Sequence, residues 1–363
     1  MKLAWKELVY SKKKYILIEL LIILLVFMVL FLSGLAEGLG RAVISGIDNM
    51  DADCFLLAES AESLITVSEL DTDVYEQLAA QTDAELAVLD IQRLYLSKQN
   101  DDEKLNITYF AIEPGSFLEP PVSDGVQLGS SDAENPILLD DDFALEGIEV
   151  GDIVTDSSTG LEFTVAGFTD DQMYGHTSIG FISTGTYTEL RTLLNPMYQK
   201  KYHTVVLRGG NIENVSIDGA ELIAKADIIE NIPSYKAEHV TITMIKWVLT
   251  AVSAAIIGVF YYILTLQKRG QFGVMKAIGM GMGRLAGFAA GQVCIIAVFG
   301  AAVANILTFA MAAALPETMP FYLNVVAAVL VTLAFIAISV ISSLISIMNI
   351  SHVDPMKVIG GAD

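Results

Sequence analysis

The sequence predicts a membrane α-helical bundle with four transmembrane helices plus one α+β extracytoplasmic domain between the first and second helices. Three observations predict this fold class. Hydrophobic residues make up 53% of the 363 residues and the mean hydropathy is +0.54, which is too apolar for an ordinary soluble protein. Four apolar runs are each long enough to cross a bilayer. The net charge of −22 is concentrated in one stretch, because 38 of the 43 acidic residues lie between Glu37 and Glu238.

The first transmembrane helix is predicted at residues 15–37, where one charge, Glu19, interrupts the apolar run. Residues 1–14 carry five lysines against one glutamate, which places the N-terminus in the cytoplasm. Their apolar residues predict an amphipathic cytoplasmic helix, with a plain solvated leader as the alternative. A cleaved signal peptide is disfavoured, because the apolar core exceeds the about 7–15 residues usual for one. We expect Glu19 to snorkel or to pair with a basic residue such as Lys276.

Residues 38–239 are predicted to form the extracytoplasmic domain. Alternating and β-branched runs indicate strands, and two amphipathic runs indicate helices. The strand candidates are LITVS, LAVLDIQRLYLS, NITYFAI, FTVAGF and HTVVLR, and the helix candidates are LDTDVYEQLAAQ and TGTYTELRTLL. The acidic composition argues against nucleic acid as a partner. Cys54 lies in this domain and Cys294 in an apolar run, which argues against an intrachain disulfide.

The rest of the chain is predicted to hold three more transmembrane helices. Residues 267–284 carry four Lys and Arg and no acid, which places them in the cytoplasm and fixes the direction of the helices on either side. The predicted segments are transmembrane helices at 240–266, 285–313 and 325–348, an outer loop at 314–324, and a cytoplasmic tail at 349–363.

The sequence contains none of the common catalytic motifs. It lacks the G-x-x-x-x-G-K-[ST] phosphate loop, so the chain does not bind ATP in the P-loop manner. It also lacks H-E-x-x-H, paired C-x-x-C and G-x-S-x-G. The four histidines are scattered, which argues against a structural metal site. We therefore predict that the chain is not an enzyme and has no catalytic residues and no intrinsic cofactor.

Two strings in the cytoplasmic parts resemble a known family. QFGVMKAIGMGMGRL and the ending DPMKVIGGAD are similar to segments of type VII ABC transporter permeases, the MacB/FtsX family. The order of four spans with one large domain after the first matches that family, as does the run at 134–168. The resemblance implies that 267–284 is a coupling segment that receives force from an ATPase subunit. It implies contacts to the ATPase by Phe272, Lys276, Ala277, Ile278 and Gly279.

Within that family, the chain resembles the haem-efflux permeases. Strings in the same order carry this resemblance: MKLAWKELVYSKKKYILI, VLFLSGLAEGLGR, DDQMYGHTSIGFI, NIPSYKAEHVTITMI, MPFYL and DPMKVIGGAD. It implies a two-fold dimer of this chain, driven by a dimer of a separate ABC ATPase subunit (HrtA-like) that holds ATP and Mg. It also implies haem as the transported substrate, removed from the lipid bilayer.

With haem as the substrate, the outer end of the first helix is the place to expect a site. Gly34 and Gly38 form a small-x-x-x-small pair that predicts close helix packing, and Glu37 borders it. Dimer symmetry would present Glu37 twice, so iron ligation by Glu37 is the one metal contact we expect. Other candidate haem contacts are Phe27, Met28, Phe31, Tyr174, Tyr235 and His239. The simpler alternative for Glu37 is an ordinary exposed pair with Arg41.

Two other functions remain open at this stage. One is a type VII permease that exports an antibiotic peptide, a lipid or a lipoprotein. The other is an FtsX-like transmembrane signal transmitter, which moves no substrate and activates a cell-wall hydrolase. A response of the ATPase to haem would separate haem efflux from both.

Overall fold

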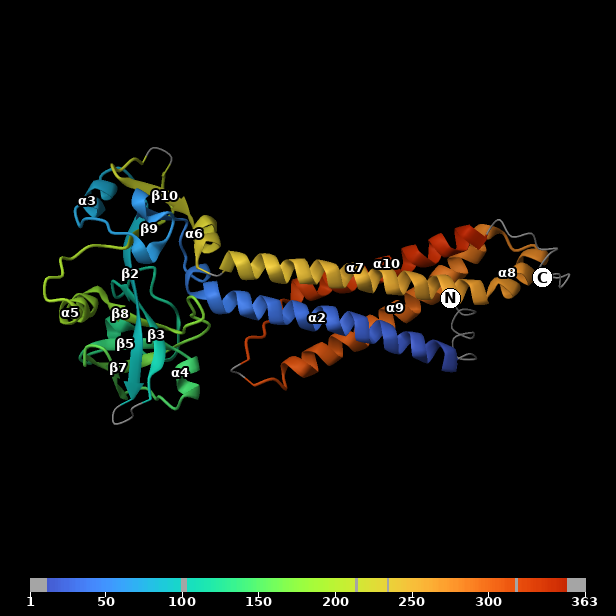
Figure 1. The fold of residues 1–363 in the computed structure, drawn as a ribbon, viewed down its shortest axis with the longest axis horizontal. Helices are drawn as coiled ribbons and strands as arrows, with labels where there is room; N and C mark the ends of the chain where they lie inside the picture. Colours follow the sequence, from blue (N-terminus) through green and yellow to red (C-terminus); the bar gives the residue numbers. More distant parts are fainter. Residues whose placement is uncertain (1–11, 99–102, 213–214, 234, 317–318, 351–363) are drawn as a thin grey trace. The chain divides into compact units, whose positions relative to one another are not determined.

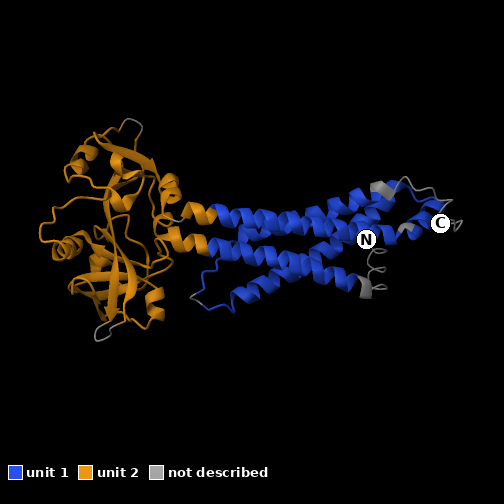
Figure 2. Ribbon diagram, viewed as in Figure 1, with its two compact units in different colours: residues 1–38, 240–363 blue, residues 39–239 orange. Residues whose placement is uncertain are grey.

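The computed structural model describes residues 12–98, 103–212, 215–233, 235–316 and 319–350. The chain divides into two compact units (Figure 2). We call residues 1–38 and 240–363 the helical unit and residues 39–239 the sheet domain. The predicted N-terminal amphipathic helix falls mainly on residues 1–11, and most of the predicted tail on 351–363, both outside the described residues.

Four helices are long and apolar enough to cross a membrane, which confirms the predicted bundle. α2 is longer than predicted and continues to Asp48, while α7 begins at Tyr235. Both helices therefore run into sequence that belongs to the sheet domain. The helices of the bundle are α2 (Lys12–Asp48), α7 (Tyr235–Gln267), α9 (Met282–Ala312) and α10 (Val325–Ile350), with the short α8 (Arg269–Ala277) between α7 and α9 (Figure 1).

The core of the helical unit is built from side chains of all four long helices. Leu30, Ile257, Ile296 and Phe335 are each at most 4% exposed and belong to one apolar cluster. Glu19 also reaches into this unit, and its Oε1 would lie 2.8 Å from a Cβ added to Gly300 of α9. Glu19 Oε1 has no hydrogen-bond partner among the described residues, and the expected snorkelling or pairing with Lys276 stays a prediction. The missing side chain at position 300 is what makes room for the carboxylate.

The sheet domain contains one mixed ten-stranded sheet. Its strand order is β10-β1-β9-β2-β3-β8-β5-β7-β4, with β6 pairing β2 and β7. The β3–β8 and β5–β7 pairs are parallel, and the other pairs are antiparallel. The strands are β1 (Cys54–Ala58), β2 (Glu85–Lys98), β3 (Leu105–Ile112), β4 (Val122–Gly125), β5 (Pro136–Asp140), β6 (Ile153–Asp156), β7 (Glu162–Thr169), β8 (Ile179–Ser183), β9 (Thr204–Arg208) and β10 (Ala220–Ala224).

Short helices connect the strands. They are α3 (Val74–Ala79), α4 (Asp142–Leu145), α5 (Thr184–Leu194) and α6 (Lys225–Asn231), with 3-10 turns at Glu59–Ala61, Ile65–Val67 and Leu128–Ser130. The strand predicted at LITVS is therefore wrong, because Ile65–Val67 is a 3-10 turn. The amide of Ser68 bonds to the carbonyl of Ile65 at 3.2 Å, and the Ser68 hydroxyl accepts from the amide of Ala58 at 3.0 Å. These turn bonds replace the sheet pairing that the β-branched residues would favour.

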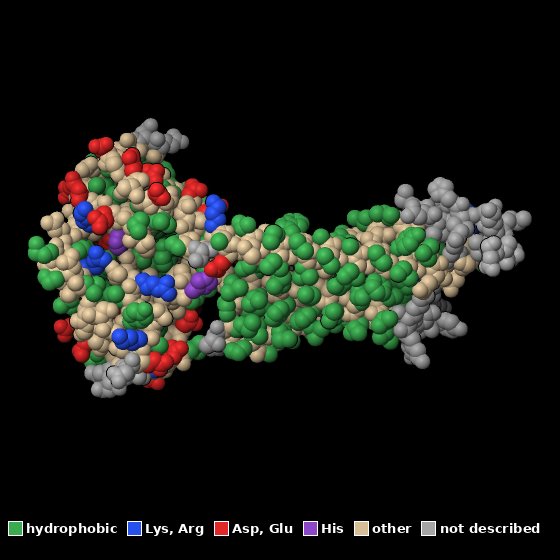
Figure 3. Space-filling view, viewed as in Figure 1, with side chains coloured by type: hydrophobic (Ala, Val, Ile, Leu, Met, Phe, Trp, Pro, Cys, Tyr) green, Lys and Arg blue, Asp and Glu red, His purple; other side chains and the backbone are tan. Residues whose placement is uncertain are grey.

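The sheet is buried on both faces. Successive side chains of a strand point to opposite faces, and Tyr109 and Phe110 of β3 accordingly belong to two different apolar clusters. Tyr109 packs on Phe163 with ring centroids 5.4 Å apart, and Phe110 contacts Phe181 edge-on at 5.8 Å. Acidic side chains dot the surface of the sheet domain, whereas hydrophobic side chains cover the helical unit (Figure 3).

Candidate substrate site and coupling surface

A loop of the sheet domain, residues 171–176, holds the C-terminal end of α2. The amide of Gly46 donates to the carbonyl of Met173 at 2.8 Å, and the amide of Met173 donates to the Ser45 hydroxyl at 2.9 Å. Further along the loop, the amide of Gly175 donates to the carbonyl of Val43 at 3.0 Å. We call this segment the 171–176 loop. Because several backbone bonds join it to α2, this end of the helix is fixed to the sheet domain.

The guanidinium of Arg41 donates to the carboxylate of Asp171 in the same loop. The simple alternative for Glu37 was an exposed pair with Arg41. The contact described for the guanidinium is the one to Asp171, and the Glu37–Arg41 pair stays a prediction. Sequence spacing alone favours a partner four residues away on the helix, whereas the fold supplies a partner from a distant loop.

The 171–176 loop also contacts the start of α7. His176 Nε2 lies 3.1 Å from Glu238 Oε2, and both side chains are partly exposed. The predicted haem contacts Tyr235 and His239 lie on either side of Glu238 in the same helix. Their ring centroids are 5.3 Å apart. A Cβ added to Gly40 would lie 3.9 Å from the Tyr235 ring, so α2 and α7 approach each other here. The structure thus brings Tyr235, His239 and the loop together within the sheet domain.

Tyr174 is the predicted haem contact that the structure buries. It is 9% exposed and packs edge-on against Phe110 with ring centroids 5.6 Å apart. Burial raises the pKa of Tyr174 to about 12. A haem contact by Tyr174 would require this part of the core to open, so its evident role is packing.

In the helical unit, Glu37 is exposed while Gly34 and Gly38 are buried. A Cβ added to Gly38 would lie 2.3 Å from the carbonyl oxygen of Pro320, and one added to Gly34 would lie 2.4 Å from the Phe321 ring. The amide of Tyr322 donates to the carbonyl of Gly34 at 3.0 Å. The glycine pair therefore receives the segment before α10, and the expectation that it packs against another helix is wrong.

A row of aromatic rings runs along α2 beside this contact. Phe27 stacks on Phe31 with centroids 5.8 Å apart, and Phe31 lies 5.4 Å from Phe321. Phe27 and Phe31 are partly exposed, and Met28 is 50% exposed on the next position of the helix. Phe321 was not among the residues predicted from the sequence. Its position between Pro320 and the last apolar run was the one feature of the sequence that pointed to it. The row offers a partly accessible apolar face, and the exposed carboxylate of Glu37 lies farther along the same helix.

The predicted coupling segment contains α8, and its residues divide by exposure. Phe272 is 3% exposed and clusters with Leu285 and Ile347, so it anchors α8 to the bundle rather than facing a partner. Ile278 is 78% exposed directly after the helix. The flanking Ala277 and Gly279 are exposed as well, Lys276 is partly exposed, and Gly279 turns the chain with a φ of +90°. The surface of this segment that is accessible to a partner protein is therefore the exposed turn around Ile278, next to Lys276.

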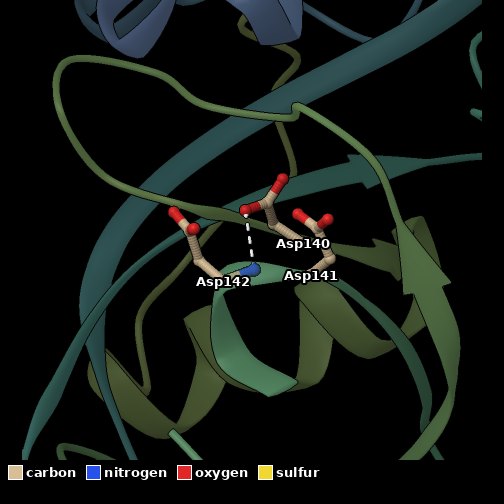
Figure 4. A group of neighbouring side chains, drawn as sticks. All are labelled: Asp140, Asp141 and Asp142. Carbon is tan, nitrogen blue, oxygen red and sulfur yellow. Dashed lines mark hydrogen bonds between the residues drawn. The ribbon is translucent and has the colours of Figure 1, made fainter. Parts of the chain in front are cut away.

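Three consecutive aspartates in the sheet domain form a group that the sequence reading did not single out. One carboxylate oxygen from each of Asp140, Asp141 and Asp142 lies within 4.8 Å of the others (Figure 4). Asp140 Oδ2 accepts from the amide of Gln172 at 2.6 Å, and Asp142 Oδ2 accepts from the hydroxyl of Ser178 at 3.0 Å. Burial raises the pKa of Asp140 to about 8. These bonds hold both ends of the loop that contacts α2, which gives the cluster a structural role.

Comparison with known proteins finds relatives over the whole length of the chain. Residues 243–355 match the family described as FtsX-like permease C-terminal. The chain is 28% identical, over 100% of both chains, to a proposed hemin transport system permease protein, HrtB, of Staphylococcus haemolyticus (strain JCSC1435). It is 27% identical, over 99% of both chains, to the HrtB of Staphylococcus epidermidis (strain ATCC 12228 / FDA PCI 1200). The extracellular domain of the ABC-type transporter YknZ from Gram-positive bacteria is 11% identical, covers 47% of this chain and 98% of that one, and has a TM-score of 0.33, which supports no argument.

Proposed function

We propose that this chain, whose residues 243–355 match the FtsX-like permease C-terminal family and which is similar over its full length to two hemin transport permeases, is the permease subunit of a haem efflux pump. The observation that carries the proposal is the similarity to hemin transport permeases across 100% of the chain, sheet domain included. A match to the permease domain alone would not separate haem from other substrates.

The proposed pump contains two copies of this chain and a dimer of an HrtA-like ABC ATPase, where ATP and Mg bind. Positive charge in residues 1–14 and 267–284 supports cytoplasmic termini and a sheet domain on the outer side. Haem, the transported substrate, partitions into the bilayer and enters from the side. The exposed apolar stripe of α2, with Leu17, Leu20 and Leu24, is a face that lipid or the second copy would cover.

The aromatic row of α2 supports haem as the substrate. A flat apolar ring needs an apolar face, and Phe27, Phe31 and Met28 provide one that is accessible from outside the bundle. Haem iron needs an axial ligand, and the exposed Glu37 carboxylate lies farther along the same helix. Tyr235 and His239 of α7 remain candidate ligands or propionate contacts. A weakly binding carboxylate ligand suits a pump that has to release its substrate.

The proposed mechanism transmits force along α7. Only Lys268 separates α7 from α8 in the chain, and this residue is 8% exposed and donates through Nζ to Gln292 Oε1 of α9 at 2.6 Å. A displacement of α8 by the ATPase would therefore move α7 with it. At its other end, α7 contacts the 171–176 loop through Glu238, and the loop holds α2. Closure of the ATPase would thus press α7 and α2 together and displace haem.

The proposal is tested by adding haem to the purified permease–ATPase complex in lipid. We expect haem to stimulate ATP hydrolysis several-fold, and we expect cells without the permease to become sensitive to haem. Absence of both responses would refute haem efflux. Stimulation by a peptide or a lipid in place of haem would favour the other permease function, and activation of a cell-wall hydrolase without transport would favour the signal transmitter.

Replacement of Glu37 by Ala is expected to weaken haem binding about tenfold and to change the absorption spectrum of bound haem, because an iron ligand is lost. Absorption titration of the purified permease measures both. Asp48→Asn is the control, since Asp48 is an exposed carboxylate at the last residue of α2, away from the aromatic row. An unchanged spectrum and affinity in the Glu37 variant would remove Glu37 as a ligand.

Replacement of Ile278 by Asp is expected to weaken association with the ATPase subunit at least about tenfold, because a charge replaces an apolar anchor at the interface. Co-purification of the two subunits measures the loss. Since Ile278 is 78% exposed, the fold and haem binding of the permease should not change. Val150→Asp, at an exposed apolar residue of the sheet domain, is the control, and equal effects of both variants would contradict the assignment.

A further inference from the structure

The sheet domain contains a cavity of about 270 Å³ that the proposed transport function does not use. It lies between α5 and the segment 195–203 that follows this helix. Its lining includes one carboxylate, two phenol rings, two cations and an imidazole, from Glu69, Tyr187, Tyr198, Arg191, Lys201 and His203. We call this cavity the Arg191 pocket.

The backbone fixes the walls of the Arg191 pocket. The hydroxyl of Ser183 caps α5 by accepting from the amide of Thr186 at 3.0 Å. The far end of the 195–203 segment is held by Tyr202, which pairs with Leu70 through two backbone bonds of 2.8 and 2.9 Å. The segment is therefore attached to the domain at both ends, and the pocket is part of the fold.

Arg191 is held between two aromatic rings. Its guanidinium carbon lies 5.0 Å from the centre of the Tyr198 ring and 5.9 Å from that of Tyr187. One guanidinium nitrogen donates to the side-chain carbonyl of Gln92. A guanidinium has five N–H groups in a rigid plane and suits bidentate binding of carboxylate or phosphate. The rings thus orient a cation that keeps donors for a further acceptor.

His203 contributes a neutral donor to the same pocket. Its Nδ1 accepts from the amide of Ile91 at 2.9 Å, so the proton of the neutral ring is on Nε2. Burial lowers the pKa of His203 to about 4, which keeps the ring uncharged near neutral pH. The backbone N–H of His203 donates to Asp90 Oδ1 at 2.7 Å, and the bond from Ile91 orients the ring. The remaining polar atom of the ring is therefore a hydrogen-bond donor.

Cations are concentrated in this region of an otherwise acidic domain. Residues 39–239 contain ten Lys and Arg against 37 acids, yet three of the ten cations, Arg191, Lys200 and Lys201, lie within one short stretch. Lys201 Nζ is 3.1 Å from Glu69 Oε2, which offsets one of these charges. A cation in the last turn of a helix is favourable by itself. That effect does not account for the second cation, the neutral imidazole donor and the cavity between them.

We propose that the Arg191 pocket binds a small oxyanion, a carboxylate or a phosphate group, with Arg191 as its main ligand and Lys201 and His203 as further donors. The two tyrosine rings would contact an apolar or planar body attached to the anion. The site is separate from the proposed haem contacts, and it would be present whether or not the permease exports haem.

Equilibrium dialysis of the purified full-length permease tests the proposal with two probes, inorganic phosphate and benzoate, at constant ionic strength. We expect saturable binding of at least one probe with one site per chain. Preference for phosphate assigns a phosphate-bearing ligand, and preference for benzoate assigns a carboxylate with an apolar body. Absence of saturable binding of either probe would overturn the proposal.

Variants separate a built site from general attraction of anions. Arg191→Gln is expected to weaken binding at least about tenfold, because it removes the charged donor. Arg93→Gln, at an exposed arginine on β2, removes the same charge and should leave binding unchanged. Equal weakening by both variants would also overturn the proposal. If Arg191→Gln lowers the melting temperature, Lys201→Gln decides, since it leaves Arg191 between its rings and is expected to weaken binding at least about threefold.

Discussion

Replacement of Gly38 by Ala is expected to lower the apparent melting temperature of the purified permease by roughly 5–10 °C, because overpacking costs about 1–3 kcal/mol or more. The added Cβ would lie 2.3 Å from the carbonyl oxygen of Pro320 and 2.6 Å from the amide nitrogen of Phe321. These are backbone atoms, which cannot rotate away as a side chain can. The segment before α10 would have to leave α2, and Phe31 would lose its contact with Phe321.

Gly40→Ala is the matched control for this prediction. The same atom is added to the same helix, but its nearest neighbour is the Tyr235 ring at 3.9 Å, an ordinary contact. Alanine also favours the helix by about 1 kcal/mol in both variants, so the difference between them reports the contact at Gly38. Gly34→Ala should fall between the two, because the Phe321 ring can move. Equal melting temperatures for the Gly38 and Gly40 variants would contradict the packing described for α2.

The stability of the sheet domain is expected to fall as the pH rises from about 4 to about 8. Burial raises the pKa of Asp140 to about 8, whereas an unfolded chain has an Asp pKa of about 3.9. Between these values the folded domain binds more protons than the unfolded chain, so the stabilisation is complete at acidic pH and is lost as the pH rises through the folded pKa. Asp90, whose pKa burial raises to about 7, acts in the same direction.

Asp140→Asn isolates this contribution. The asparagine oxygen can still accept from the amide of Gln172, but the side chain no longer ionises. We expect the variant to gain roughly 3–4 kcal/mol over the natural chain between pH 5 and pH 8. Urea titration of the full-length protein in detergent, followed by proteolysis of the sheet domain, measures the difference. Asp132→Asn, at an exposed carboxylate, should show no such gain, and parallel pH profiles for all three proteins would disprove the role of Asp140.

The structure bears out sequence predictions that rest on long, repetitive patterns. The four transmembrane helices were predictable because about 20 apolar residues have few alternatives to crossing a bilayer as a helix. β2, β3, β7 and β9 were predictable from alternating or β-branched residues. LITVS carries the same residue types but forms a 3-10 turn, because the hydroxyl of Ser68 is used as an acceptor by the distant Ala58. The secondary structure of such a short run is therefore decided by its hydrogen-bond partners elsewhere in the chain.

Among the predicted site residues, local spacing likewise predicted some contacts and missed those made with distant parts of the chain. Spacing along one helix correctly places Phe27 and Phe31 in contact, because residues four apart on a helix are neighbours. Spacing could not show that Tyr174 is buried, that Phe272 anchors α8, or that Phe321 completes the aromatic row. Each of these depends on residues far away in the sequence. The Arg191 pocket was not visible in the sequence for the same reason, since Glu69 and Arg191 meet only in the folded domain.

By itself, the sequence determined that this protein crosses the membrane four times and carries one acidic α+β domain after its first helix. Hydrophobicity and charge act locally, and they leave the backbone few choices over a span of 20 residues. Only the tertiary structure decided what each polar or small residue in these spans contacts. Arg41 contacts Asp171, which lies far away in the sequence, and Gly38 receives Pro320 instead of a neighbouring helix. Such contacts join residues far apart in the chain, and only the packed fold selects among the many partners that a short motif allows.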